Sequence, residues 1–128
     1  MKQLYIADDN EDFSEFVASV AISRGWEPIL CVNGKDLVEK VSSGTGSALL
    51  IVDINMPKMD GIEAIEGLVG VDRPMRLRFI TGGADAPLLA AKMIAKARSL
   101  SVGRNIYKPL RKNDLVVLLE KEERELED

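Results

Sequence analysis

Short apolar runs alternate along the chain with longer segments in which apolar residues recur every three or four positions. A short apolar run is typical of a buried strand, whereas the three-or-four spacing is typical of a helix with one buried face. The runs fall at residues 4–7, 29–32, 48–52 and 77–80, and a last, short one ends at 106–107. The helical spacing falls at residues 13–21, 37–41, 62–69, 89–100 and 115–126. The pattern therefore predicts strands and helices in strict alternation.

Capping residues mark several of the predicted helix boundaries. Asn33 and Asp85 stand where an N-cap is expected, because their side-chain oxygens can accept a hydrogen bond from the first turn of a helix. Asp60 with Glu63 has the spacing of a capping box, and Gly25 is expected to end the first helix. These signals follow one another without a linker or a repeat, so the chain is predicted to form one domain over its whole length.

Alternating strands and helices imply a parallel sheet with helices on both faces. The continuous apolar run at 48–52 supports this, because a strand covered on both faces needs apolar residues at every position. We therefore expect a flavodoxin-like, doubly wound α/β fold with a five-stranded parallel sheet in the order 2-1-3-4-5. In such a sheet ligands bind beyond the carboxyl ends of the strands, so residues at these ends are the candidates for function.

Composition and charge exclude several classes of protein. Apolar residues make up 46% of the 128 residues and charged residues 30%, which is a globular profile. The net charge of −4, without a clustered basic face, argues against a nucleic-acid partner. The chain has no histidine, which excludes a histidine metal site and a phosphohistidine of its own. A single cysteine, no signal peptide and no apolar stretch of about 20 residues favour the cytoplasm and no membrane partner.

Acidic and polar residues directly follow the predicted strands: Asp8 and Asp9 the first, Asp53 the third, Thr81 the fourth and Lys108 the fifth. Strands one and three are neighbours in the predicted order, so three carboxylates converge at one edge of the sheet. Like charges this close disfavour ionisation unless a positive charge compensates them, and one lysine supplies too little. A hard divalent cation with oxygen ligands would neutralise the cluster. We expect Mg²⁺, with Mn²⁺ as a substitute.

The motifs at the strand ends are Asp8–Asp9, DINMPKMDG at 53–61, Thr81–Gly82 and Lys108–Pro109. Taken together they resemble the receiver domain of bacterial two-component response regulators. Each motif is short, but all of them match the family in residue type and order, and the resemblance covers essentially the whole chain. It implies a signalling switch that promotes only its own phosphorylation and dephosphorylation, and not an enzyme.

The resemblance implies that Asp53 accepts a phosphoryl group from the phosphohistidine of a sensor histidine kinase or phosphotransfer protein. It assigns Asp53 and Asp9 as direct Mg²⁺ ligands and Asp8 as a ligand through water. The backbone carbonyl of Asn55 is then the remaining protein ligand. The metal ion would stabilise charge that develops on the phosphoryl oxygens during transfer.

The remaining motif residues are implied to bind the phosphoryl group and to tune its lifetime. Lys108 pairs with one phosphoryl oxygen, and the hydroxyl of Thr81 reaches another. Pro109 follows the lysine, and the family often has a cis bond there. Asn55 and Gly83 flank the path of the hydrolytic water, and Gly83 leaves that path uncovered, which predicts no strong steric block to dephosphorylation.

One position departs from the family pattern. Asn105 stands where the family often carries an aromatic residue that turns inward on phosphorylation, and strand alternation prevents Tyr107 from replacing it without a register change. We therefore expect readout through the 82–87 loop and the surface of helix 4, strand 5 and helix 5, which would bind a downstream partner or a second copy of the chain. The acidic residues 120–128 are interpreted as a solvated last turn or as the start of a connector to an effector domain.

Other interpretations stay open at this point. A receiver-like scaffold would act by binding alone, without phosphorylation. A flavin mononucleotide carrier needs a loop rich in Gly, Ser and Thr after the first strand, where this chain has Asp8–Asp9. A small-molecule phosphatase usually carries a second Asp two places after its nucleophile, where this chain has Asn55. The acidic pair and Asn10 also fit a simple N-cap of the first helix.

Overall fold

The computed structural model describes residues 2–54, 61–82 and 85–127. Within this part of the chain, strands and helices alternate as the sequence predicts. The strands are β1 (Gln3–Ala7), β2 (Glu27–Cys31), β3 (Ala48–Asp53), β4 (Met75–Thr81) and β5 (Ile106–Tyr107). The helices are α1 (Glu11–Ser23), α2 (Gly34–Ser43), α3 (Gly61–Leu68), α4 (Asp85–Ala97) and α5 (Lys112–Glu127).

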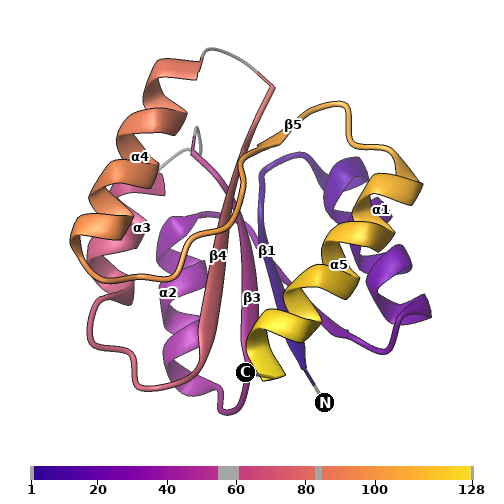
Figure 1. Ribbon diagram of the computed structural model, residues 1–128, viewed down its shortest axis with the longest axis horizontal. Coiled ribbons are helices and arrows are strands. Elements are labelled where there is room, and N and C mark those ends of the chain that lie inside the picture. Colours follow the sequence, from indigo (N-terminus) through magenta and orange to yellow (C-terminus); the bar gives the residue numbers. More distant parts are fainter. Residues whose placement is uncertain (1, 55–60, 83–84, 128) are drawn as a thin grey trace.

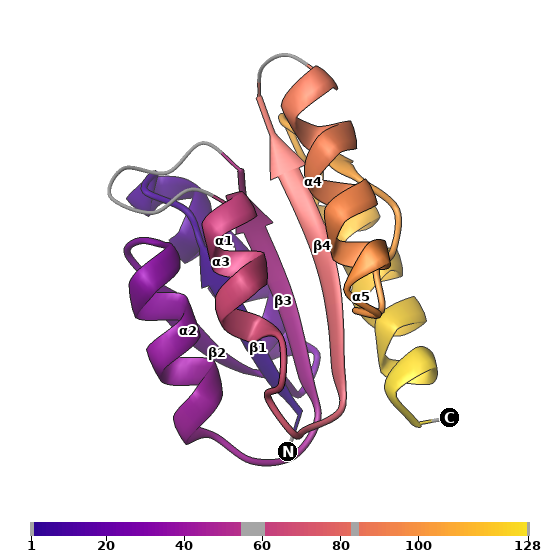
Figure 2. The ribbon, with the colours of Figure 1, turned by 90° about the vertical axis from the view of Figure 1, so that its left-hand side faces the viewer.

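The strands form one parallel sheet in the order β2-β1-β3-β4-β5, which confirms the predicted fold class. Helices α2, α3 and α4 cover one face of the sheet, and α1 and α5 cover the other (Figure 1). Figure 2 shows the side that carries α2, α3 and α4. Ala7 pairs with Val52, and Asp53 pairs with Ile80, so the carboxyl ends of β1, β3 and β4 lie level with one another.

Two apolar layers, one on each face of the sheet, hold the helices in place. Alternate residues of a strand point to opposite faces, so Tyr5 and Phe79 pack beneath α2–α4, whereas Ile6 and Ile80 pack beneath α1 and α5. β3 is buried at every position because helices cover both of its faces. Each fully buried side chain of this size contributes about 1.5–3 kcal/mol. The layers therefore fix the positions of the strand ends.

Local hydrogen bonds determine where the helices begin. Asn10 is the N-cap of α1, and its Oδ1 accepts a hydrogen bond from the backbone N–H of Phe13 at 3.1 Å. Asn33 is the N-cap of α2, as predicted, and its Oδ1 accepts from the N–H of Asp36 at 2.8 Å. Asp60 lies outside the described residues, so the capping box with Glu63 stays a prediction.

Several element boundaries differ from the sequence pattern. α4 ends at Ala97 rather than at Leu100, because Ser99 adopts a left-handed φ of 64°. The N–H of Leu100 then donates to the carbonyl oxygen of Ala95 at 3.0 Å, which closes the helix. β2 and β4 each begin two residues earlier than predicted. These differences do not change the order of the elements.

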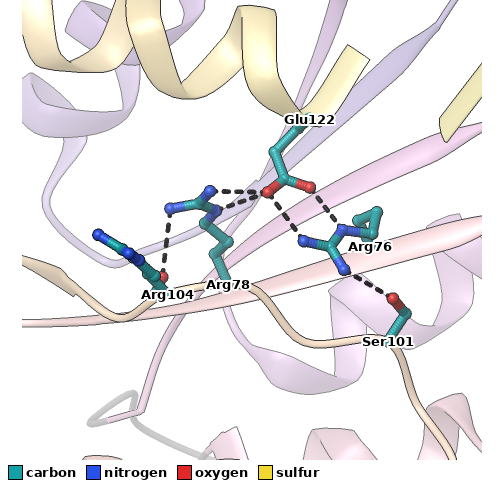
Figure 3. A network of polar contacts seen from close by, with 5 residues as sticks. All are labelled: Arg76, Arg78, Ser101, Arg104 and Glu122. Carbon is teal, nitrogen blue, oxygen red and sulfur yellow. Dashed lines mark hydrogen bonds and ion pairs between the residues drawn. The ribbon is translucent and has the colours of Figure 1, made fainter. Parts of the chain in front are cut away.

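Buried charges fasten α5 to β4. Arg76 and Arg78 interrupt the apolar pattern of β4 because they point to the face that α5 covers, where both meet Glu122 (Figure 3). Arg76 Nε lies 2.6 Å from Glu122 Oε2, and Arg78 Nη2 lies 2.7 Å from Oε1. Arg76 also donates to the hydroxyl of Ser101 at 2.8 Å. Glu122 is fully buried, so the interpretation of residues 120–128 as a solvated turn is wrong at this position.

The two arginines determine the ionisation of Glu122. Burial by itself raises the pKa of this carboxyl, but the hydrogen bonds from Arg76 and Arg78 outweigh it, and the pKa is lowered overall. The hydrogen bond to Glu122 in turn raises the pKa of Arg76. Gly103 leaves space for the group, because a Cβ there would lie 2.8 Å from Arg78 Nε and 3.0 Å from Glu122 Oε1.

Candidate functional site

Three carboxylates meet at the carboxyl edge of the sheet. Asp8 and Asp9 follow β1, and Asp53 is the last residue of β3, the strand next to it. One oxygen from each carboxylate lies within 4.8 Å of the others. Asp8 and Asp53 are buried, at 4% and 7% exposure, whereas Asp9 is exposed. Two of the three carboxylates therefore lie inside the protein, and the third is open to water.

The chemistry of this cluster fits a hard divalent cation. Among the described residues no hydrogen bond reaches the buried oxygen Oδ2 of Asp8, although it lies in ion-pair contact with Lys108. Three acidic groups around one open space supply oxygen ligands and more negative charge than one lysine balances. Mg²⁺ takes a few carboxylates of this kind and keeps several of its waters. Asp8, Asp9 and Asp53 are thus the residues that could hold it.

Lys108 brings a positive charge to the same edge. Its Nζ lies 2.7 Å from Asp8 Oδ2 and 3.7 Å from Asp53 Oδ2. The backbone N–H of Lys108 donates to the carbonyl oxygen of Thr81 at 3.0 Å, which ties the lysine to the end of β4. The peptide bond between Lys108 and Pro109 is cis. The ammonium group therefore lies between the carboxylates of two strand ends.

Thr81 completes the row of strand-end residues. It is the last residue of β4, only 1% exposed, and its register partner in β5 is Tyr107. The structure thus brings Asp8, Asp9 and Asp53 together with Lys108, and it places Thr81 on the adjacent strand. Asn55 and Gly83, the other two residues singled out in the sequence, lie outside the described residues.

Phe13 is a neighbour of the site that the sequence pattern did not reveal. Its apolar side chain fitted the buried face of the first helix, and it does pack partly against the core beneath α1. Its ring also lies against the lysine, with Lys108 Nζ 4.7 Å from the ring centroid. One signal in the sequence could have revealed this neighbour. Phe13 is the third residue of α1, so it lies close to the end of β1, which the helix follows.

Asn105 lies beside a hollow rather than in a filled core position. Its Oδ1 is buried and has no hydrogen-bond partner among the described residues. The hollow, of about 430 Å³, lies between β5 and α5 and is lined among others by Asn105, Leu110 and Leu118. Ile106 and Tyr107 also line the hollow, and Tyr107 is 50% exposed whereas Ile106 is buried. The readout expected from Asn105 and Tyr107 stays a prediction.

In the part of the chain that the structure describes, no helix is both long enough and apolar enough to cross a lipid bilayer.

The fold and the acidic strand ends define an α/β module of the response-regulator type, and sequence comparison names the family. The family model of the response regulator receiver domain matches residues 4–120, and the chain belongs to this family. A response regulator receiver protein, CpdR, of Brucella abortus is 30% identical over 121 residues, which cover 94% of this chain and 96% of that protein. The chemotaxis protein CheY of Treponema pallidum is 32% identical over 110 residues, 84% of this chain and 73% of that one.

Solved structures show the same fold at low sequence identity. A two-component response regulator from Clostridium difficile superimposes with a TM-score of 0.81 and 16% identity, with full coverage of both chains. The receiver domain of sensor histidine kinase PA1611 from Pseudomonas aeruginosa PAO1, with magnesium coordinated in its active-site cleft, gives a TM-score of 0.71 at 14% identity. That match covers 93% of this chain and 94% of the other. As a receiver domain, this chain is a signalling module rather than a classical enzyme, and receiver domains generally partner with histidine kinases.

Proposed function

We propose that this chain is a phosphorylation-controlled switch that accepts a phosphoryl group on Asp53. The observation that carries the proposal is the position of this carboxylate, which lies beside an acidic pair that can hold a cation and 3.7 Å from the ammonium nitrogen of Lys108. A sensor histidine kinase or a phosphotransfer protein would supply the group as a phosphohistidine. An Asp53 oxygen forms a bond to phosphorus, the phosphorus–nitrogen bond breaks, and the electron pair leaves with the imidazole.

The surrounding side chains would carry the charge of the transferred group. Lys108 is close enough to Asp53 to pair with a phosphoryl oxygen on it, and the Thr81 hydroxyl at the end of β4 would bind another oxygen. Positioning and charge neutralisation of this kind account for most of the acceleration of phosphoryl transfer. Mg²⁺ held by Asp8, Asp9 and Asp53 would supply further neutralisation when bound. Asp8 would bind the ion through water, and the backbone carbonyl of Asn55 would be the remaining direct protein ligand.

Incubation with acetyl phosphate and Mg²⁺, followed by intact mass measurement, tests the proposal. We expect the gain of one phosphoryl group, its loss in Asp53→Asn, and its loss when EDTA removes the cation. Asp72→Asn is the matched control, because Asp72 is an exposed aspartate that precedes β4, away from the carboxyl edge. Wild-type protein that stays unmodified would instead support a receiver-like scaffold that acts by binding alone.

The output surface is proposed to lie over α4, β5 and α5. Among the residues whose exposure is described, each of these elements has a large apolar side chain at the surface: Met93 at 63%, Tyr107 at 50% and Val117 at 64%. Such a surface suits a downstream protein or a second copy of the chain. A phosphoryl mimic such as beryllofluoride should change amide exchange in residues 82–107 and on α5. Exchange that stays the same in both regions would contradict this assignment.

A further inference from the structure

Four contacts form a closed cycle that includes Lys108. Lys108 Nζ lies 2.7 Å from Asp8 Oδ2, and the other oxygen of Asp8 accepts the backbone N–H of Asn10 at 2.9 Å. The side chain of Asn10 accepts the backbone N–H of Phe13 at 3.1 Å. The ring of Phe13 then returns to Lys108, whose Nζ lies 4.7 Å from the ring centroid. The start of α1 and the end of β5 are thereby joined through a single ammonium group.

The fold holds each residue of this cycle of contacts in place. Asp8 is buried at the end of β1, and Asn10 is the N-cap that fixes the first turn of α1. Phe13 is the third residue of α1, and its side chain packs partly against the apolar layer that also contains Val17. The aromatic ring of Phe13 is therefore presented to Lys108 by a rigid helix. By contrast, a lysine side chain is a flexible four-carbon stem and needs partners to hold its charge in one place.

We propose that Phe13 is a positioning residue for Lys108, whose ring holds the ammonium group beside Asp8 and Asp53 through a cation–π contact. The inference rests on the proposed function, since the position matters because Lys108 would neutralise the phosphoryl group on Asp53. An ammonium group within about 6 Å of a ring centroid is attracted by the electron-rich face. A carboxylate in the place of the Phe13 ring would bind the lysine and compete with the phosphoryl oxygens. A ring attracts the ammonium without such competition.

A ring also allows the lysine to change partners. In this structure Lys108 is closer to Asp8 than to Asp53, by 2.7 Å against 3.7 Å. A phosphoryl group on Asp53 would draw the ammonium away from Asp8. The cation–π attraction depends less on direction than a hydrogen bond does, so the ring face keeps contact with Nζ during this shift. Phe13 would therefore hold Lys108 both before and after phosphoryl transfer.

Substitutions that separate the ring from its bulk test the inference. Phe13→Leu keeps an apolar side chain but removes the ring, and Phe13→Tyr keeps the ring. Phe16→Leu is the matched control, because Phe16 lies on the same helix and packs partly against the same apolar layer. We expect Phe13→Leu to slow phosphorylation by acetyl phosphate by about three- to tenfold. Phe13→Tyr should restore a rate close to that of wild type, and Phe16→Leu should leave the rate unchanged.

A spectroscopic measurement distinguishes positioning from general packing and does not depend on phosphorylation. The ring current of Phe13 should shift the Hε protons of Lys108 upfield in the unphosphorylated protein, and this shift should disappear in Phe13→Leu and persist in Phe13→Tyr and Phe16→Leu. An unshifted Hε signal in wild type, or a Phe13→Leu rate equal to that of wild type, overturns the inference. Wild-type protein that shows the upfield shift but accepts no phosphoryl group overturns the proposed function instead, while the contact between ring and lysine stands.

Discussion

At the scale of single residues, burial and the nearest charge together determine chemical behaviour. Asp8 and Asp53 are buried carboxylates, but each has the Lys108 ammonium within 3.7 Å, so their charges are partly balanced. Cys31 lies in the apolar layer at the end of β2, and burial raises the pKa of its thiol to about 12, although Lys40 opposes the effect. Burial thus keeps the thiol at the end of β2 neutral, whereas the buried carboxylates at the ends of β1 and β3 lie beside an ammonium group.

The buried thiol of Cys31 is expected to be unreactive in the folded protein. The thiolate is the reactive form, and a pKa near 12 instead of 9.0 leaves roughly a thousandth of the usual thiolate near pH 8. Alkylation by iodoacetamide at pH 8 should therefore be at least about 100-fold slower in the native protein than in guanidinium chloride. The unfolded chain serves as its own control, since Cys31 is the single cysteine. Comparable native and unfolded rates would contradict this account.

At the scale of elements, a helix can be attached to a sheet by charge as well as by apolar contact. The apolar layer beneath α5 includes Leu115 and Leu119, and the ion pairs of Glu122 extend this attachment along the helix. A buried ion pair adds little over well-packed apolar residues, but the loss of one partner is expensive because it leaves a buried charge without compensation. Arg76 and Arg78 would both lose their partner together.

Substitution of Glu122 should therefore destabilise the domain strongly. We expect Glu122→Gln to lower the free energy of unfolding by about 3–5 kcal/mol in chemical denaturation at pH 7. Glu123→Gln is the matched control, because Glu123 lies next in α5 and its 3.6 Å ion pair with Lys2 is largely solvated. That control should change the free energy of unfolding by less than about 1 kcal/mol. Equal effects of the two substitutions would refute the attachment.

The same carboxyl predicts a pH dependence. The pKa of Glu122 is lowered in the folded state from its ordinary value of 4.5, so the unfolded chain takes up the proton first as the pH falls. The stability from this group is fully present above about pH 4.5 and is lost as the pH falls further. The difference in unfolding free energy between wild type and Glu122→Gln should accordingly shrink below pH 4.5. A difference that stays constant from pH 6 to the acid transition would contradict the lowered pKa.

At the scale of the whole molecule, the parallel sheet collects charge at one edge. The strands run in the same direction, so residues far apart in the sequence, such as Asp9, Asp53 and Lys108, meet beyond their carboxyl ends. Three acidic groups in this place repel one another in the absence of a cation. A cation that binds only the folded arrangement then stabilises the entire domain, because the unfolded chain does not hold the three carboxylates together.

Mg²⁺ should therefore raise the unfolding temperature. At a concentration about 100 times its dissociation constant, the expected stabilisation is about 2.7 kcal/mol, which corresponds to about ten degrees for a domain of this size. EDTA should reverse the shift, and Asp9→Asn should remove most of it. Asp12→Asn should retain it, because Asp12 is an exposed acid in the first turn of α1 and is not part of the cluster. The same shift in both variants would indicate a general effect of salt.

The amino-acid sequence by itself determined the fold and the position of the site. Periodicity is a local property, so the alternation of strands and helices could be recognised from runs such as 48–52 and from the N-cap Asn33. General rules of chain connection then left few orders for the parallel strands, and the flavodoxin-like order 2-1-3-4-5 was the one expected. Because the site consists of residues that directly follow strands, the meeting of Asp8, Asp9, Asp53 and Lys108 could also be anticipated.

Only the tertiary structure decided which side chains touch across elements. Arg76 and Arg78 looked like interruptions of a strand, and Glu122 looked like part of a solvated tail, because no local pattern records that β4 and α5 bring them to within hydrogen-bond distance. Phe13 likewise looked like an ordinary apolar position until the fold placed its ring 4.7 Å from Lys108 Nζ. Such contacts depend on distances between segments separated by dozens of residues, and these distances exist only once the sheet and helices have packed.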